Sequence, residues 1–123
     1  AELDEIVRLV GMDALSYKDR VTMETAKIIR EDYLHQNAFH ETDTYTSMKK
    51  QYKMLKIIEA YYNGAREAVD NYADLNDVLN IPSKEKIGRA KYVEEENIAE
   101  LDDTLKAVTR ELKTVADGGN ADV

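Results

Sequence analysis

The sequence predicts an all-α fold, a small helical bundle of about four to six helices. The 123 residues include one Pro and five Gly, so few positions interrupt a helix. Apolar residues recur every three or four positions, which is the spacing of amphipathic helices, and no segment alternates as a strand does. A hydrophobic content of 43% is enough for a single core. We expect residues 1–117 to form one domain and residues 118–123 to form a flexible tail.

Two helices joined by a short connection are predicted near the N-terminus. The first is short, and its apolar stripe consists of Leu3, Ile6, Val7 and Val10. It ends at Gly11, because glycine readily adopts the left-handed conformation that ends helices. Ser16 can cap the second helix by accepting the backbone N–H of Asp19. This helix is expected to run to about Gln36, with a buried side made of Val21, Ile28, Ile29, Tyr33 and Leu34.

An irregular segment and a long helix follow. Residues 37–47, NAFHETDTYTS, are rich in turn-forming and cap-forming side chains. Thr46 or Ser47 then begins the first of two long helices, at about residues 47–73. Its predicted buried stripe, with alternating steps of four and three, is Met48, Tyr52, Leu55, Ile58, Tyr62, Ala65, Val69 and Tyr72.

The C-terminal part predicts two short helices and one long one. Asp74 can cap one or two turns in DLNDVLN, and Pro82 suits the first turn of a short helix through SKEKIGRAKY. The second long helix covers about residues 93–116, and its stripe is Ile98, Leu101, Leu105, Val108, Leu112 and Val115. We expect this stripe to dock on the bundle itself, while a coiled-coil seam with a partner helix is the alternative.

Composition restricts the possible partners. The chain has 17 Lys plus Arg against 25 Asp plus Glu, a net charge of −8, which disfavours nucleic acid and anionic lipid surfaces. No apolar run is long enough to span a membrane, so direct membrane insertion is not expected. Cysteine is absent, which excludes disulfides and thiolate chemistry. A protein or a small ligand is therefore the expected partner.

Few residues form a recognisable catalytic or metal-binding pattern. His35 and His40 are the two histidines, and Asp32 with His35 makes only half of a di-iron carboxylate motif. We therefore predict no metal site and no catalytic residue. A phosphate-binding GxxxxGK[ST] loop is also absent from the sequence.

Two other clusters have alternative interpretations. The basic cluster Lys84, Lys86, Arg89 and Lys91 precedes three glutamates at 94–96, and we expect a solvated face with intrahelical pairs rather than an anion site. Phe39, the only Phe, and Tyr45 lie outside every amphipathic stripe. They either anchor their loop to the core or present flat apolar faces to a planar ligand.

The N-terminal segment ELDEIVRLVGMDALSYKDRVTMETAKIIREDYLHQNAF resembles a known family. It is similar to the C-terminal helical domain of the catalytic alpha chain of archaeal-type and vacuolar-type rotary ATPases, and less closely to the catalytic beta chain of F-type ATP synthases. LVGMDALS and REDYLHQNAF match in order and spacing, and the similarity continues through IPSKEKIGRAKY. The resemblance implies that residues 1–117 are the C-terminal helical bundle domain of a larger catalytic subunit, and the start at Ala1 also favours a fragment.

The same resemblance implies two functional regions. Residues Asp13, Ala14, Leu15, Ser16, Tyr17, Lys18 and Asp19 align with the acidic DELSEED loop of F-type relatives, which contacts the rotating central shaft. Three acidic positions are replaced, by Ala14, Tyr17 and Lys18, so a steric push is expected to replace charge attraction. The adenine side of the nucleotide pocket is implied for Gln36, Asn37, Ala38, Phe39 and Tyr45.

These regions imply a function in coupling. The family's phosphate loop, catalytic Glu and magnesium ligands belong to a preceding domain, so ATP or ADP with magnesium is expected in the full-length subunit. The isolated fragment is expected to be inactive and to have no nucleotide bound. Implied partners are the B-type subunits of the catalytic hexamer and the central stalk rotor subunits, in a cytoplasmic complex peripheral to the membrane that couples ATP synthesis or hydrolysis to proton or sodium transport. The alternative is a freestanding helical adaptor that binds a partner helix through its C-terminal heptad stripe.

Overall fold

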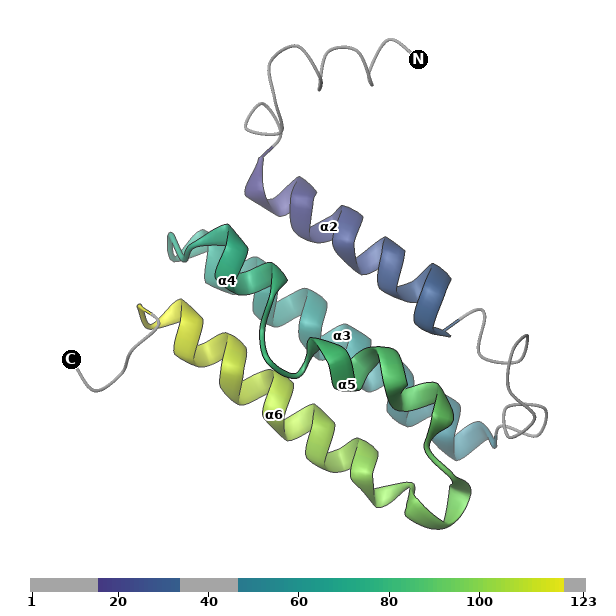
Figure 1. The fold of residues 1–123 in the computed structure, drawn as a ribbon. Helices are drawn as coiled ribbons and strands as arrows, with labels where there is room; N and C mark the ends of the chain where they lie inside the picture. The colour runs from purple at the N-terminus through teal and green to yellow at the C-terminus, as the bar shows by residue number, and fades with distance from the viewer. Residues whose placement is uncertain (1–15, 34–46, 119–123) are drawn as a thin grey trace, which may run out of the picture.

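The computed structural model describes residues 16–33 and 47–118, and these residues form a bundle of α-helices without a strand (Figure 1). The all-α prediction is therefore confirmed. The described elements are α2 (Tyr17–Ile28), the π-helix η2 (Ile29–Tyr33), α3 (Met48–Asp70), α4 (Leu75–Leu79), α5 (Lys84–Arg89), the 3₁₀ turns η4 (Ala90–Tyr92) and η5 (Glu95–Asn97), and α6 (Ala99–Ala116). The predicted first helix, the irregular segment and the tail from residue 119 lie outside these residues and stay predictions.

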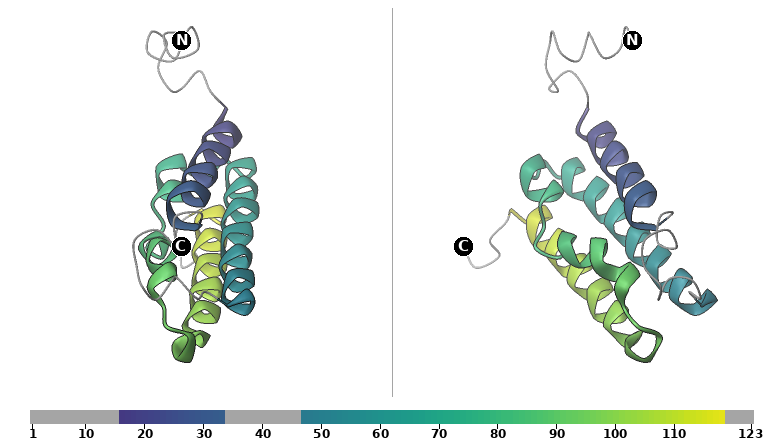
Figure 2. Two further views of the ribbon diagram at one scale, coloured as in Figure 1. Left: turned by 90° about the vertical axis from the view of Figure 1, so that its right-hand side faces the viewer. Right: turned by 45° about the vertical axis from the view of Figure 1, so that its right-hand side comes forward.

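Helix α3 is the centre of the bundle. Figures 1 and 2 show α2 running antiparallel to α3 on one side, and α6 running in the same direction as α3 on the other. The short helices α4 and α5 lie across this layer, and α5 contacts both α3 and α6. As a result α2 ends, α3 begins and residues 90–97 turn at the same end of the bundle.

The core is formed by one face of each of α2, α3 and α6, with further residues from the short helices and their connections: Ala73, Leu75, Val78, Ile81, Ile87 and Ala90. From α2 it receives Val21, Thr25 and Ile28. The buried face of α3 consists of Lys50, Met54, Ile57, Ile58, Tyr61, Ala65, Ala68 and Val69. The last helix contributes Leu101, Thr104, Ala107, Val108 and Leu112, which confirms that its stripe docks on its own bundle.

The predicted buried stripe of α3 is wrong over half of its length. Met48, Tyr52, Leu55 and Tyr72 are exposed at 80%, 62%, 44% and 94%. Because α3 packs against α2 on one side and α6 on the other, its buried arc is centred between them, around the row Lys50, Met54, Ile57 and Tyr61. A single apolar stripe cannot reveal this rotation, since Lys50 enters the core with a long aliphatic stem.

The predicted capping residues agree with the structure better than the predicted helix bounds do. Ser16, Ser47 and Asp74 cap α2, α3 and α4 as predicted, and each accepts a backbone N–H, the closest at 3.1, 3.0 and 2.7 Å. The predicted continuous helix to Gln36 changes at Ile29 into η2. Helix α3 ends at Asp70 rather than residue 73, because Tyr72 adopts a left-handed φ of 64°. The last helix begins at Ala99 rather than residue 93, since η5 occupies 95–97, and Pro82 precedes α5 instead of lying within it.

Candidate functional site: the two ends of α2

The structure describes four of the predicted site residues. Ser16, Tyr17, Lys18 and Asp19 form the start of α2, at the cap and in the first turn. The other predicted rotor contacts, Asp13, Ala14 and Leu15, lie outside the described residues. So do all the predicted adenine-side residues, Gln36, Asn37, Ala38, Phe39 and Tyr45. The start of α2 therefore belongs to the predicted rotor contact. The end of η2 and the start of α3 are the described parts that flank the predicted adenine-side residues in the sequence.

The first turn of α2 is a capped and outward-facing tip. Ser16, Tyr17, Lys18 and Asp19 are all exposed. The Ser16 hydroxyl accepts the N–H of Asp19 at 3.1 Å, and the acidic side chain of Asp19 suits the positive end of the helix. One turn later Val21 is fully buried, so the tip continues directly into an anchored helix.

Lys18, the residue that reverses the charge of the acidic loop, is paired inside the chain. Its Nζ lies 2.8 Å from a carboxylate oxygen of Asp70 at the end of α3. A lysine in the first turn of a helix and an aspartate in the last turn each oppose the helix dipole. Each charge thus offsets the unfavourable position of the other, and the pair ties the tip of α2 to α3.

At the opposite end, Ser47, the N-cap of α3 and the first residue described after the gap, is held by a carboxylate. Ser47 donates its backbone N–H to one oxygen of Glu95 at 3.0 Å and its hydroxyl to the other at 2.9 Å. These hydrogen bonds, with the largest effect from the hydroxyl, lower the pKa of Glu95 below its usual value of 4.5. No local pattern indicates this contact, because the two residues are 48 positions apart.

The end of η2 is fixed to the same region. Lys91 donates to the carbonyl of Glu31 at 3.2 Å, and its Nζ lies 4.0 Å from the Asp32 carboxylate. The carbonyl of Lys91 accepts a hydrogen bond from the Lys50 ammonium at 2.9 Å. Lys50 is 1% exposed, so this bond gives a buried charge a polar partner. Burial raises the pKa of Asp32, and the charge of Lys91 opposes that rise.

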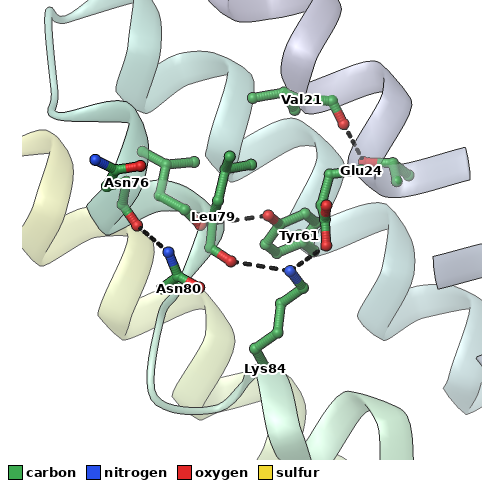
Figure 3. Close-up of polar contacts among 9 residues, drawn as sticks. Val21, Glu24, Tyr61, Asn76, Leu79, Asn80 and Lys84 are labelled. Atoms are coloured by element: carbon green, nitrogen blue, oxygen red, sulfur yellow. Dashed lines mark hydrogen bonds and ion pairs between the residues drawn. The ribbon is translucent and has the colours of Figure 1, made fainter. Parts of the chain in front are cut away.

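A polar cluster fastens the middle of α2 (Figure 3). Glu24 on α2 forms an ion pair with Lys84 on α5, and Lys84 also donates to the carbonyl of Leu79 at 2.9 Å. Beside them the fully buried Tyr61 donates its hydroxyl to the carbonyl of Val78 at 3.3 Å. Burial, with a smaller contribution from Glu24, raises the pKa of Tyr61. The cluster thereby joins four helices.

These contacts correct part of the predicted basic cluster. Only Arg89 makes the expected intrahelical pair, with Glu85 at 3.3 Å. Lys84 and Lys91 instead bind residues of α2 and η2, 60 positions earlier in the chain. The expectation of a purely solvated face is therefore wrong for those two lysines.

The rest of the described part of the chain was searched for a metal site, a membrane span and a groove. There, no group of three or more His, Asp or Glu side chains could hold a metal ion. None of the described helices combines the length and the hydropathy that a membrane span requires. A groove of about 450 Å³ lies between α5 and the start of α6. Lys86 and Arg89 line one side of this groove, and Glu100 and Asp103 line the other.

Comparison with known proteins identifies the family. Residues 1–79 match the family model described as the C-terminal domain of V and A type ATP synthase. The chain belongs to this family. It is 50% identical over 122 residues to the V-type ATP synthase alpha chain of Thermoanaerobacter pseudethanolicus, covering 99% of this chain and 21% of that protein. The family resemblance predicted from the sequence is thereby confirmed.

Two further relatives give the same picture. The V-type ATP synthase alpha chain of Clostridium perfringens is 52% identical over 120 residues, which is 97% of this chain and 20% of the relative. That of Acetivibrio thermocellus is 58% identical over 98 residues, 80% of this chain and 17% of the relative. The chain thus spans about a fifth of the length of these relatives.

Proposed function

We propose that the chain is the C-terminal domain of the catalytic, nucleotide-binding subunit of a rotary A/V-type ATP synthase. It contributes the adenine side of the nucleotide site through residues 36–39 and Tyr45, and it contacts the central stalk through residues 13–19. Motion passes between the two regions through the bundle. In this way ATP synthesis or hydrolysis is coupled to the transport of protons or sodium ions.

The observation that supports this proposal is the continuity of α2 and η2. Together they form one uninterrupted helical element of 12 and 5 residues. It begins within the proposed stalk contact and ends at Tyr33, three residues before Gln36. At about 1.5 Å per residue the element is about 25 Å long, so a single stiff element covers most of the sequence between the two proposed regions.

An element that transmits motion must also be held firmly to the rest of its domain. Three tertiary contacts hold α2 and η2: Lys18 with Asp70 at the tip, Glu24 with Lys84 in the middle, and Asp32 with Lys91 at the end. Between them the side chains of Val21, Thr25 and Ile28 are buried. The bundle is therefore suited to move with α2 as one body, which a transmitting domain requires.

Coupling of this kind acts in both directions. If nucleotide binding moves the tip, then the position of the stalk must change nucleotide affinity by the same free energy. The partners in this proposal are the B-type subunits of the catalytic hexamer and the central stalk, in a cytoplasmic complex peripheral to the membrane.

Alone, the chain should neither hydrolyse ATP nor bind it tightly. Its sequence contains no GxxxxGK[ST] loop, and an adenine subsite without phosphate contacts forgoes most of the binding energy. Isothermal titration calorimetry with magnesium-ATP should detect at most weak binding. Micromolar affinity would contradict the proposed division between this domain and the rest of the catalytic chain.

Two variants of the full-length protein, assembled in its complex, separate the two roles. Phe39→Ala should raise the KM for ATP, because it removes an apolar face from the adenine. Leu15→Ala should leave the KM unchanged and lower the number of ions transported per ATP. Equal effects of both variants on nucleotide affinity would refute the division of labour.

A further inference from the structure

We infer that Tyr72, at the corner between α3 and α4, is a further contact residue for the partner that meets the tip of α2. Under the proposed function, on which this inference rests, that partner is a protein of the central stalk. The contact then extends from the start of α2 to a second element of the bundle.

The backbone at Tyr72 is left-handed because the end of α3 requires it. Tyr72 donates its N–H to the carbonyl of Val69 at 3.1 Å, and Ala73 donates to the carbonyl of Ala68 at 3.0 Å. These two bonds form a Schellman helix end, in which the residue after the C-cap has a positive φ. The turn places Ala73, which is 8% exposed, against the core. The fold therefore needs the φ of 64° at position 72.

Tyrosine is an unfavourable residue for that position. A Cβ atom disfavours the left-handed conformation, and glycine is the usual residue at this point of a helix end. The chain has glycine at the equivalent point after α6, where Gly118 has a φ of 101° and donates its N–H to Val115 at 3.1 Å. Among the described residues, Tyr72 is the one non-glycine residue with a positive φ.

The side chain of Tyr72 does not offset this cost by packing. It is 94% exposed, the largest exposed fraction among the large apolar side chains of the described part. A strained backbone position whose side chain does not pack in its own domain indicates a function for that side chain. Tyrosine is enriched in protein–protein contacts, because it combines a large apolar ring with a hydroxyl.

Tyr72 lies at the same end of the bundle as the tip of α2. Helices α2 and α3 are antiparallel, so α2 begins where α3 ends (Figure 1). The ion pair between Lys18 and Asp70, at 2.8 Å, joins the two segments two residues before Tyr72. Tyr17, next to Lys18, is 48% exposed. Each of the two joined segments thus carries an exposed tyrosine, and a partner that docks on the tip is within reach of Tyr72.

The chemistry of this corner fits a protein partner. Lys18 and Asp70 neutralise each other, and the net charge of −8 disfavours nucleic acid and anionic lipid. The two tyrosines offer apolar ring surface and hydroxyls that can form hydrogen bonds. The matching surface is one with apolar side chains and hydrogen-bonding groups rather than one of strong charge.

Tyr72→Gly separates the backbone strain from the contact. In urea denaturation of the chain, it should raise the ratio of folded to unfolded protein by about threefold to tenfold, because glycine tolerates the left-handed conformation. Gly118→Ala is the matched control and should lower that ratio. Its added Cβ atom would have no heavy atom within 4 Å, so it measures the cost of the conformation alone. A Tyr72→Gly chain no more stable than wild type would overturn the inference, because the tyrosine would then stabilise its own domain.

The full-length protein in its assembled complex tests the contact. Tyr72→Gly and Tyr72→Asn both suit a left-handed residue and both remove the ring, so each should lower the number of ions transported per ATP. Tyr52→Asn is the control, since Tyr52 is also an exposed tyrosine of α3, at 62%, but lies about 27 Å along the helix from its end. It should leave the ratio of ions to ATP unchanged.

Photocrosslinking identifies the partner in the same complex. A benzophenone amino acid in place of Tyr72 should crosslink to a stalk subunit under ultraviolet light, and the same group in place of Tyr52 should not. A crosslink from position 72 to a ring subunit or to lipid instead, or no crosslink, would overturn the inference. So would an unchanged ratio of ions to ATP in either Tyr72 variant, or an equal loss in Tyr52→Asn.

Leu15→Ala tests the proposed stalk contact separately. If Leu15→Ala lowers the ratio of ions to ATP and the Tyr72 variants do not, only the extension of the contact to Tyr72 is removed. If the Tyr72 variants lower the ratio and crosslink to the stalk while Leu15→Ala has no effect, the proposed contact at residues 13–19 fails and the contact at Tyr72 stands.

Discussion

Helices α3 and α6 pack closely at Gly64, and this contact leads to a prediction whose sign depends on the residue at position 112. A Cβ atom at Gly64 would lie 2.9 Å from Cδ1 and 3.3 Å from Cβ of Leu112. Leu112 is 1% exposed and belongs to the central core. The glycine therefore permits the close approach of the two long helices, although glycine is a poor residue for a helix interior.

The expected magnitudes follow from this geometry. Leu112→Ala should lower the free energy of unfolding by about 2–5 kcal/mol, because it leaves a cavity between α3 and α6. Gly64→Ala gains about 1 kcal/mol of helix propensity but must displace Leu112, a strain of about 1–3 kcal/mol, so its net effect should be destabilising. In the Leu112→Ala background the closest clashing atom is gone. There the same Gly64→Ala change should stabilise by about 0.5–1 kcal/mol.

Urea denaturation followed by far-ultraviolet circular dichroism measures the four variants of the cycle. The double variant should be more stable than the sum of the single changes by about 1–3 kcal/mol. Additive effects would refute the close approach of Gly64 and Leu112. So would a Gly64→Ala variant that is more stable than the wild-type chain.

Two further predictions concern charged pairs. Exchanging Lys18 and Asp70 in the double variant Lys18→Asp with Asp70→Lys should raise the free energy of unfolding by about 0.5–1.5 kcal/mol in urea denaturation, since the pair is kept and both charges then suit their helix ends. Lys18→Asp alone should be less stable than the double variant, because two aspartates then face each other. Burial raises the pKa of the Asp32 carboxyl above its ordinary value of 3.8. The protonated carboxyl therefore contributes stability that is fully present below the ordinary pKa and is lost as the pH rises through the raised pKa. Denaturation from pH 3 upward should therefore show a smaller loss of stability in Asp32→Asn than in wild type.

The sequence predicted what depends on neighbouring residues. The caps at Ser16, Ser47 and Asp74 were found because a cap needs only a polar side chain followed two or three residues later by a free N–H. The stripe of α6 was found because this helix lies at one side of the bundle and buries one face. The family could also be predicted from the sequence, since its motifs are contiguous stretches of residues.

Features that depend on distant contacts were not predictable in this way. The buried arc of α3 is set by two flanking helices, so Met48 and Tyr52 were placed in the core although both are exposed. The partner of Lys84 on α2 and the partner of Lys91 on η2 are each 60 residues away, and no local pattern specifies them. The change from α-helix to π-helix at Ile29 could not be predicted either, because the apolar spacing of the sequence continues unchanged through Tyr33.

The pairing of Lys18 bears on how the proposed lever acts on the stalk. An electrostatic mechanism needs unpaired acidic charge at the tip. In the described part of the tip, residues 16–19, Asp19 is the one acidic residue and Lys18 is neutralised by Asp70, while Asp13 lies outside the described residues. Because the screening length in physiological salt is about 8–10 Å, the exposed Asp19 carboxylate exerts little directed force on a neighbouring protein. A steric mechanism needs a stiff tip instead. The Ser16 cap, the Lys18 contact with α3 and the burial of Val21 one turn later supply that stiffness, so we expect removal of the Asp19 charge to affect coupling less than loosening of the Lys18 contact.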